Sequence, residues 1–210
     1  MIYLIITSSL KTSIWMDHPE RREEEYQKAI SQTLTILPPS IKPIIVENNG
    51  QRSTWLTHIT FQNQHVKVIY TDHNQQQTKN KGITELMDLH TVIEQCNISS
   101  QDMIIKITGR YYPLSSYFFE TVINQENRYD AFIRFYNVTH KQSEEYDCVL
   151  GMYAIRCSYL MCWNPHSVSH YRSPEVAFAR YIRLSGARLK EMDHLHLQCV
   201  FSKDGEVLEV

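Results

Sequence analysis

The sequence predicts an α/β fold with a mixed, mostly parallel central sheet that is flanked by helices on both faces. Residues 1–7 form a continuous apolar run, which is typical of a strand buried on both of its faces. Segments with strand-like and helix-like patterns then alternate along the chain, and this order favours parallel strands joined by crossover helices. The chain has 210 residues and is 42% hydrophobic, which is enough for one core in a single domain.

The elements of the first half follow from local signals. Asp17 is the N-cap expected for a helix whose apolar stripe covers residues 26–37, and a pair of prolines ends that helix. The other elements predicted here are strands at residues 43–47, 66–70 and 103–107 and a helix across residues 82–93.

The second half continues the alternation. Ser173 followed by Pro174 predicts the start of a helix that runs to about Leu184. A helix at about residues 115–124 and strands at residues 131–135 and 149–155 precede it. Residues 194–201 alternate as in a strand, and residues 206–210 are expected to pair beside them.

Charge and hydropathy narrow the possible partners and location. The formal net charge is -2, so no electrostatic signal indicates nucleic acid or an anionic membrane. The apolar run at residues 2–6 is too short to span a bilayer and has no basic flank, so it indicates neither a transmembrane segment nor a signal peptide. These observations predict a cytoplasmic protein.

Cysteine and glycine usage argue against several common sites. The five cysteines include no C-x-x-C pair, so we expect buried free thiols, with a zinc site of Cys157, Cys162, His166 and His170 as the alternative. The six glycines form neither a G-x-G-x-x-G nor a G-x-x-x-x-G-K motif. A dinucleotide site of the common type and a P-loop are therefore disfavoured.

Polar residues follow the predicted strands where a ligand is expected, because open parallel sheets bind ligands outside the carboxyl ends of their strands. A carboxylate there can accept a hydrogen bond from a base or from ribose, and a lysine at a helix N-terminus can hold a phosphate. The candidates at these strand and helix ends are Thr7, Ser8, Glu47, Asn49, Asp72 and Lys81.

Several segments resemble known sugar-transferring enzymes. Residues 44–50, Asn80-Lys81-Gly82 and the strand from Met103 resemble the nucleotide-sugar half of the GT-A glycosyltransferases. Residues 106–111, 130–132 and 149–153 more closely resemble a chlorella-virus glycosyltransferase domain, from machinery of giant DNA viruses that glycosylates a major capsid protein.

The resemblance implies one GT-A-like, Rossmann-like domain over residues 1–210. Residues 1–112 or so would bind a nucleotide sugar, and residues 113–210 would face the acceptor. The implied donor is a UDP-linked hexose or deoxyhexose, the implied acceptor is a glycan or glycoprotein, and the implied setting is viral capsid glycosylation in the host cytoplasm. A nucleotidyltransferase and a non-catalytic glycan-binding module are the alternatives.

The chain departs from the family where an Asp-x-Asp metal motif is expected. It has Lys106-Ile107-Thr108-Gly109-Arg110 instead. A transferase must neutralise the charge that develops on the leaving diphosphate, and Lys106, Arg110 and Lys81 are cations placed to do so. We therefore expect weak or absent metal dependence. Manganese or magnesium is the alternative, with ligands drawn from Asp72, His73, His194 and His196.

The resemblance also implies a catalytic carboxylate at the start of a late helix. Glu175 in Ser173-Pro174-Glu175 matches that position, and Asp147 is a second candidate. The alternative for Glu175 is structural, because an acidic residue in a first helical turn also complements the helix dipole.

Overall fold

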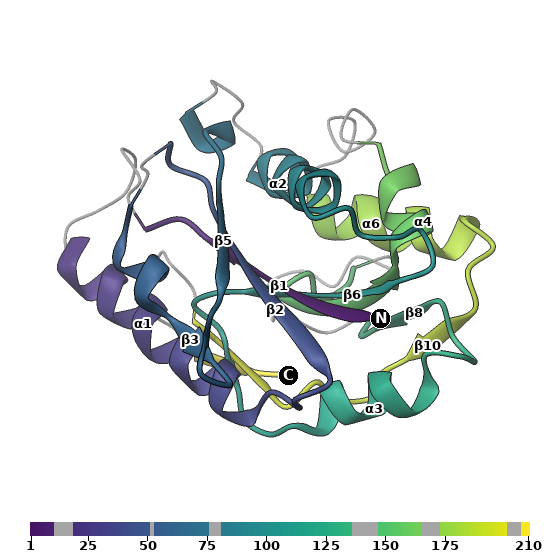
Figure 1. Ribbon diagram of the computed structural model, residues 1–210. Helices are drawn as coiled ribbons and strands as arrows, with labels where there is room; N and C mark the ends of the chain where they lie inside the picture. Colours follow the sequence, from purple (N-terminus) through teal and green to yellow (C-terminus); the bar gives the residue numbers. More distant parts are fainter. Residues whose placement is uncertain (11–18, 51–52, 76–80, 136–146, 165–172, 201–206) are drawn as a thin grey trace.

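A seven-stranded sheet forms the centre of the protein in a computed structural model, which describes residues 1–10, 19–50, 53–75, 81–135, 147–164, 173–200 and 207–210. The strand order is β10-β8-β9-β6-β1-β2-β5 (Figure 1). The strands are β1 (Ile2–Ser8), β2 (Ile41–Glu47), β5 (Lys67–Tyr70), β6 (Met103–Thr108), β8 (Ala131–Ile133), β9 (Met152–Arg156) and β10 (Leu189–Glu191).

The sheet is mixed but mostly parallel, as predicted. β1 pairs in parallel with both β2 and β6, and β5 pairs in parallel with β2. β9 is antiparallel to its two neighbours, β6 and β8, whereas β10 is parallel to β8. The carboxyl ends of β1, β2, β5, β6, β8 and β10 therefore share one edge of the sheet.

Helices cover both faces of the sheet (Figure 1). α1 (Pro19–Ile36) and α3 (Tyr117–Gln125) pack on one face, where their apolar side chains join those of alternate β1 residues such as Leu4 and Ile6. α2 (Lys81–Gln95), α4 (Cys157–Cys162) and α6 (Pro174–Leu184) pack on the other face, which includes Ile5. Burial of β1 from both sides confirms the interpretation of the first apolar run.

Two small sheets complete the fold. β11 (Leu197–Val200) pairs with β12 (Val207–Glu209) and with β7 (Tyr112–Pro113), so the pairing expected for the last two segments is confirmed. β3 (Thr60–Phe61) and β4 (Gln64–His65) form a hairpin between two 3₁₀ turns, Trp55–His58 and His73–Gln75.

The observed end of a helix or strand agrees with the predicted one where a specific capping residue determines it. The Ser173 hydroxyl accepts a hydrogen bond from the Val176 amide at 3.2 Å, and α6 begins at Pro174 as predicted. β8 is shorter than predicted, because the chain after Ile133 leaves the ladder and Phe135 forms only an isolated bridge with Cys148. Asp17 lies outside the described residues. No helix in the described parts of the chain combines the length and apolar character needed to cross a bilayer.

Candidate functional site

The loops after β1, β2, β5 and β6 meet at the carboxyl edge of the sheet, where a ligand was expected. The Asn48 amide donates to the Ser8 carbonyl at 3.3 Å, and the Gly50 amide donates to the Thr71 carbonyl at 2.7 Å. The Gly109 amide donates to the Thr7 carbonyl at 2.8 Å. These backbone hydrogen bonds hold the four strand tips in one fixed rim.

Glu47 organises this rim from inside. Its carboxylate accepts hydrogen bonds from the Ser8 hydroxyl at 2.7 Å, from the Leu10 amide at 3.1 and 3.2 Å, and from the Asn49 side-chain amide. Burial raises the pKa of Glu47, and these hydrogen bonds oppose that rise. Because the residue is 0% exposed, a nucleoside would meet the groups that Glu47 positions rather than its carboxylate.

A second buried carboxylate, Asp88 of α2, ties the same rim to the helix. It accepts from the Asn48 side-chain amide at 3.0 Å and from the Thr71 hydroxyl at 2.5 Å, and it pairs with His73 Nδ1 at 2.7 Å. Burial raises the pKa of Asp88 against the effect of these partners. The sequence analysis missed Asp88, whose only signal was a polar residue on an otherwise apolar helix face.

Lys106 forms an ion pair with a protein carboxylate and is not available to bind a ligand phosphate. Its ammonium lies 2.8 Å from Glu85 Oε1 and donates to the Thr108 hydroxyl at 2.9 Å and to the Leu150 carbonyl at 2.8 Å. The Thr7 hydroxyl donates to the same Glu85 oxygen at 2.6 Å. The side chain of Lys106 is 1% exposed and that of Glu85 is 29% exposed, so Glu85 is the member of this network that reaches the surface.

Two arginines lie over the ring of Tyr26 at the β1 tip, and a lysine is close enough to feel their charges. The guanidinium carbons of Arg22 and Arg110 lie 5.3 and 6.0 Å from the centre of the Tyr26 ring. Burial lowers the pKa of Lys81, the first residue of α2, and the nearby charges of Arg22 and Arg110 lower it further. We call Arg22, Lys81 and Arg110 the cation cluster.

The cation cluster is only partly neutralised by the described residues. Arg110 lies 3.9 Å from the Glu25 carboxylate, and its Nε is buried without a hydrogen-bond partner among them. Arg22 Nε donates to the Ser9 carbonyl at 2.7 Å. Among the described residues, these three positive charges have one ion-paired carboxylate, Glu25, and such an excess of cations favours binding of an anion.

The two catalytic candidates lie on the β9 side of the edge. Glu175 is in the first turn of α6, and the thiol of Cys148 contacts its carbonyl at 3.3 Å. Asp147 accepts from the Cys148 amide at 2.9 Å. Burial raises the pKa of Glu175, and the charges of Asp147 and Glu85 raise it further. Glu175 is thus a partly exposed carboxyl group with raised proton affinity, which suits proton transfer.

The expected metal ligands do not come together. Asp72 and His73 follow β5 at one end of the sheet, whereas His194 and His196 follow β10 at the other end. His194 contacts Arg134 at 3.4 Å, and His196 stacks on Tyr117 with ring centres 5.0 Å apart. No group of three or more metal-ligating side chains is assembled within the described ranges. β6 ends at Thr108, and the charged side chains beside that end, Lys106 and Arg110, are cations that cannot serve as metal ligands.

The alternative zinc site is only partly covered by the structure. Cys157 is buried, with its thiol 3.9 Å from the Ile98 carbonyl, and Cys162 is exposed. Histidines 166 and 170 lie outside the described residues. All five cysteines are free thiols, as expected, but only Cys148, Cys157 and Cys199 are buried, because Cys96 is partly exposed and Cys162 is exposed.

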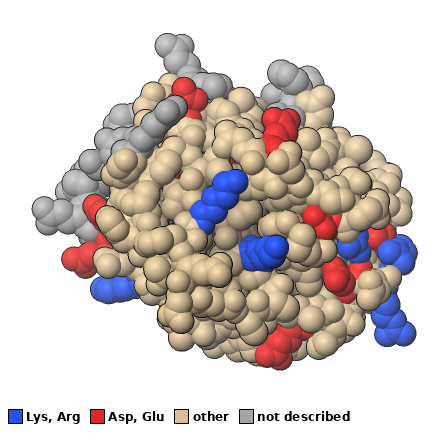
Figure 2. All heavy atoms as spheres, viewed as in Figure 1, with Lys and Arg blue, Asp and Glu red and all other residues tan. Residues whose placement is uncertain are grey.

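Charged side chains are mixed in sign on the face of the molecule in Figure 2. Basic and acidic residues there stand singly or in mixed groups, without a broad field of one sign among the described residues. This distribution agrees with the small net charge of -2.

The fold is that of the nucleotide-diphospho-sugar transferases. A transferase of that description from Desulfovibrio desulfuricans G20 matches with a TM-score of 0.59 at 9% identity, over 91% of this chain and 79% of that chain. Mouse xyloside xylosyltransferase 1 matches with a TM-score of 0.52 at 12% identity, over 91% and 84% of the two chains.

A nucleotidyl-transferring enzyme has the same architecture. The 4-diphosphocytidyl-2C-methyl-D-erythritol synthase from Anaerococcus prevotii matches with a TM-score of 0.55 at 11% identity, over 91% of this chain and 86% of that chain. No family model and no curated protein matches the sequence. At these identities the similarity establishes the fold, and the function must be argued from the site.

Proposed function

We propose that the protein is a glycosyltransferase that binds a nucleotide-diphosphate sugar at the carboxyl edge of its sheet. The cation cluster is the observation that carries this proposal. Arg22, Lys81 and Arg110 converge there from α1, from the start of α2 and from the loop after β6. A diphosphate needs positive charge from several directions, and two guanidinium groups can bind its oxygens bidentately.

The N-terminus of α2 adds to this arrangement. Lys81 is the first residue of a 15-residue helix, whose dipole favours a phosphate at that end. In this assignment Thr7, Ser8, Glu47 and Lys106 position the rim, and Asn49 and Asp72 lie where the nucleoside would enter. The buried residues of the proposed donor site therefore mainly form hydrogen bonds and ion pairs with other protein residues.

For the chemical step, Glu175 is the proposed general base and Asp147 is the second candidate. The acceptor hydroxyl transfers its proton to the carboxylate while the acceptor oxygen forms a bond to C1 of the donor sugar. The bond from C1 to the diphosphate oxygen breaks, and the nucleoside diphosphate leaves with both electrons, stabilised by the cation cluster. The raised pKa of Glu175 improves it as a proton acceptor.

The substrates follow from the sequence resemblance. It supports a UDP-linked hexose or deoxyhexose as donor and a glycan or glycoprotein as acceptor, in the manner of the chlorella-virus capsid-glycan domain. The nucleotidyltransferase alternative has its own support in the similarity to the Anaerococcus enzyme. The six glycines of the chain form no P-loop-like motif, and this favours sugar transfer.

A ligand panel followed by product analysis separates these functions. UDP, UDP-sugars and free sugars are compared by thermal shift, because a ligand that binds only the folded state raises the melting temperature. A glycosyltransferase releases UDP from a UDP-sugar, whereas a nucleotidyltransferase releases pyrophosphate from a nucleoside triphosphate and a sugar phosphate. Stabilisation by free sugars alone, without any nucleotide effect, would contradict both enzymatic functions.

Arg110→Ala tests the cation cluster within the same assay. We expect the UDP-dependent thermal shift to shrink and turnover to fall by about 100-fold, as when a donor that stabilises transition-state charge is removed. Arg128→Ala is the matched control, because Arg128 is an exposed arginine just after the end of α3. If both variants show the same UDP-dependent thermal shift and turnover, the cation cluster is not part of the donor site.

A further inference from the structure

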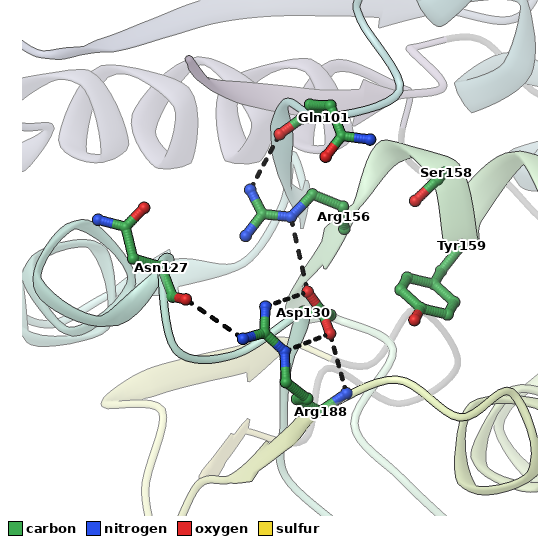
Figure 3. A pocket seen from close by; sticks show the side chains of 7 residues that line it. All are labelled: Gln101, Asn127, Asp130, Arg156, Ser158, Tyr159 and Arg188. Carbon is green, nitrogen blue, oxygen red and sulfur yellow. Dashed lines mark hydrogen bonds and ion pairs between the residues drawn. The ribbon is translucent and has the colours of Figure 1, made fainter.

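A separate pocket opens at the amino edge of the sheet, opposite the proposed donor site. It encloses about 490 Å³ beside the starts of β6, β8 and β10 and the end of the antiparallel strand β9. Asp130, Arg156 and Arg188 form its centre (Figure 3). Nothing in the proposed transfer reaction uses this pocket.

The three charged residues form a closed ion-pair network. Arg188 donates to Asp130 from Nε at 2.9 Å, from Nη2 at 2.8 Å and from its backbone amide at 3.1 Å. Arg156 Nε lies 3.8 Å from the same carboxylate. The hydrogen bonds from Arg188 hold the pKa of Asp130 below its usual value, so the network stays charged near neutral pH.

The remaining guanidinium donors also point to protein acceptors. Arg156 Nη1 donates to the Gln101 carbonyl at 3.0 Å, and its Nη2 donates to the carbonyls of Glu126 and Tyr129. Arg188 Nη1 donates to the Asn127 carbonyl at 3.3 Å. Glu126 lies 3.7 Å from Arg156 and supplies a second negative charge. The pocket therefore has little net charge and few guanidinium donors left for an anion.

Four uncharged polar side chains surround this network. Gln101 and Asn127 contribute amides, and Ser158 and Tyr159 contribute hydroxyls from the first turn of α4 (Figure 3). None of these four side-chain groups has a hydrogen bond to another described residue. Each can both donate and accept a hydrogen bond, which matches the hydroxyl groups of a sugar.

The walls of the pocket are fixed by the backbone. The Ser158 amide donates to the Ser100 carbonyl at 3.0 Å, and the Arg156 amide donates to the Asp130 carbonyl at 2.7 Å. The Asp130 amide donates to the Arg188 carbonyl at 2.8 Å. These hydrogen bonds fix the backbone from which the polar side chains extend, so a ligand does not have to order the backbone as well.

We propose that this pocket is a binding subsite for a neutral sugar residue of a glycan, separate from the donor site. The ion-pair network supplies the rigid floor, the four uncharged side chains recognise the hydroxyl groups, and binding involves no chemical step. The assignment rests on the pocket itself, so it stands whether or not the chain transfers sugars.

Titration of the full-length protein with neutral disaccharides tests the subsite. Maltose, lactose and cellobiose are added singly, and the side-chain amide resonances of Gln101 and Asn127 are followed by NMR. We expect shifts of these resonances with millimolar affinity for at least one sugar, and no shift with UDP. Inorganic phosphate serves as the anion probe.

Two variants and a control give the test its specificity. Tyr159→Ala and Asn127→Ala are each expected to weaken sugar binding about 10-fold, the loss of roughly one hydrogen bond. Asn124→Ala, at an exposed position of α3, should bind as the original chain does. Binding of phosphate instead of sugars, absence of any sugar-dependent shift, or shifts unchanged in both variants would each overturn the proposal.

Discussion

Glu175, at the start of α6, is partly exposed and has a raised pKa. Burial is the main cause of the rise, and Asp147 and Glu85 add to it. The stability that this group contributes is present when it is protonated, and it is lost as the pH rises through the folded-state pKa. Once the pH exceeds that pKa, the folded protein bears the cost of an ionised carboxylate at this position.

We predict that Glu175→Gln separates activity from stability. Turnover should fall by about 100-fold or more, because general-base catalysis is lost, while the melting temperature at neutral pH stays equal or rises. Steady-state assays and thermal unfolding of the same preparations measure the two effects. In the original enzyme, turnover should decline on the acid side at a higher pH than an ordinary glutamate would give.

Asp147→Asn is the comparison for this variant. A larger loss of turnover in Asp147→Asn than in Glu175→Gln would transfer the base role to Asp147. If turnover is unchanged in both variants, neither carboxylate acts as the general base.

At the same scale, the sequence predicted which residues meet but not how they are used. Thr7 and Glu47 lie at the carboxyl edge, as expected for residues at strand ends, and Lys106, proposed from the missing metal motif, lies near them. The sequence could not show that Glu47 and Lys106 are buried by protein partners, because the partner of Lys106 is Glu85, on a helix that precedes β6 in sequence. Glu85 and Asp88 are ordinary acidic positions of an amphipathic helix until the tertiary packing is known.

Among the elements, the turn after β6 requires a residue without a side chain. A Cβ at Gly109 would lie 2.9 Å from the Thr7 carbonyl oxygen, 3.1 Å from Tyr26 and 3.2 Å from Ile6. The backbone of β1 and the ring of Tyr26 are thus in close contact with this turn. The close approach places Arg110, the next residue, beside the Tyr26 ring.

We predict that Gly109→Ala lowers stability by about 1–3 kcal/mol, because the added methyl group overpacks a fixed backbone contact. It should also weaken nucleotide binding, because Arg110 is displaced. Denaturant unfolding and the UDP thermal shift measure the two effects.

Gly186→Ala is the matched control for this substitution. Gly186 follows α6 with a φ of +77°, and a Cβ there would meet no atom within 4 Å, so alanine at this position costs backbone strain alone. It should lose stability while its nucleotide affinity is unchanged. Unaltered UDP binding in Gly109→Ala would contradict the role of this turn.

Elements with strong local signals were the predictable ones. The Ser173 cap and Pro174 located α6, and the apolar runs located β1 and β6. The direction of β9 was not predictable, because residue periodicity is the same in parallel and antiparallel strands. The short elements β3, β4, β7, β10 and α4 were missed, because two to six residues carry too little pattern.

On the scale of the whole molecule, the sheet separates two kinds of polar site. Its carboxyl edge holds an excess of positive charge in the cation cluster, and its amino edge holds a charge-balanced pocket. The site at the carboxyl edge could be predicted from sequence, because open parallel sheets bind ligands outside the carboxyl ends of their strands. The pocket at the amino edge is made of loop residues that come together only in three dimensions.

The charge distribution predicts how the proposed sugar transfer responds to chelation. We expect sugar transfer to keep most of its rate in excess EDTA, because Arg22, Lys81 and Arg110 take the place of a divalent ion at the diphosphate. Rates measured with EDTA, and with manganese or magnesium added back, test this. Loss of activity in EDTA that manganese restores would show that a metal carries out this role.

The pairing of Lys106 with Glu85 also constrains how this chain can evolve. Glu85→Ala would leave a buried ammonium group without a carboxylate, at a cost of about 3–5 kcal/mol, whereas replacing both residues with apolar ones can be nearly neutral. The two positions should therefore change together among descendants of this sequence, with single replacements selected against. A mutant library that randomises one position alone would sample mostly unstable proteins, and one that randomises both would recover folded variants.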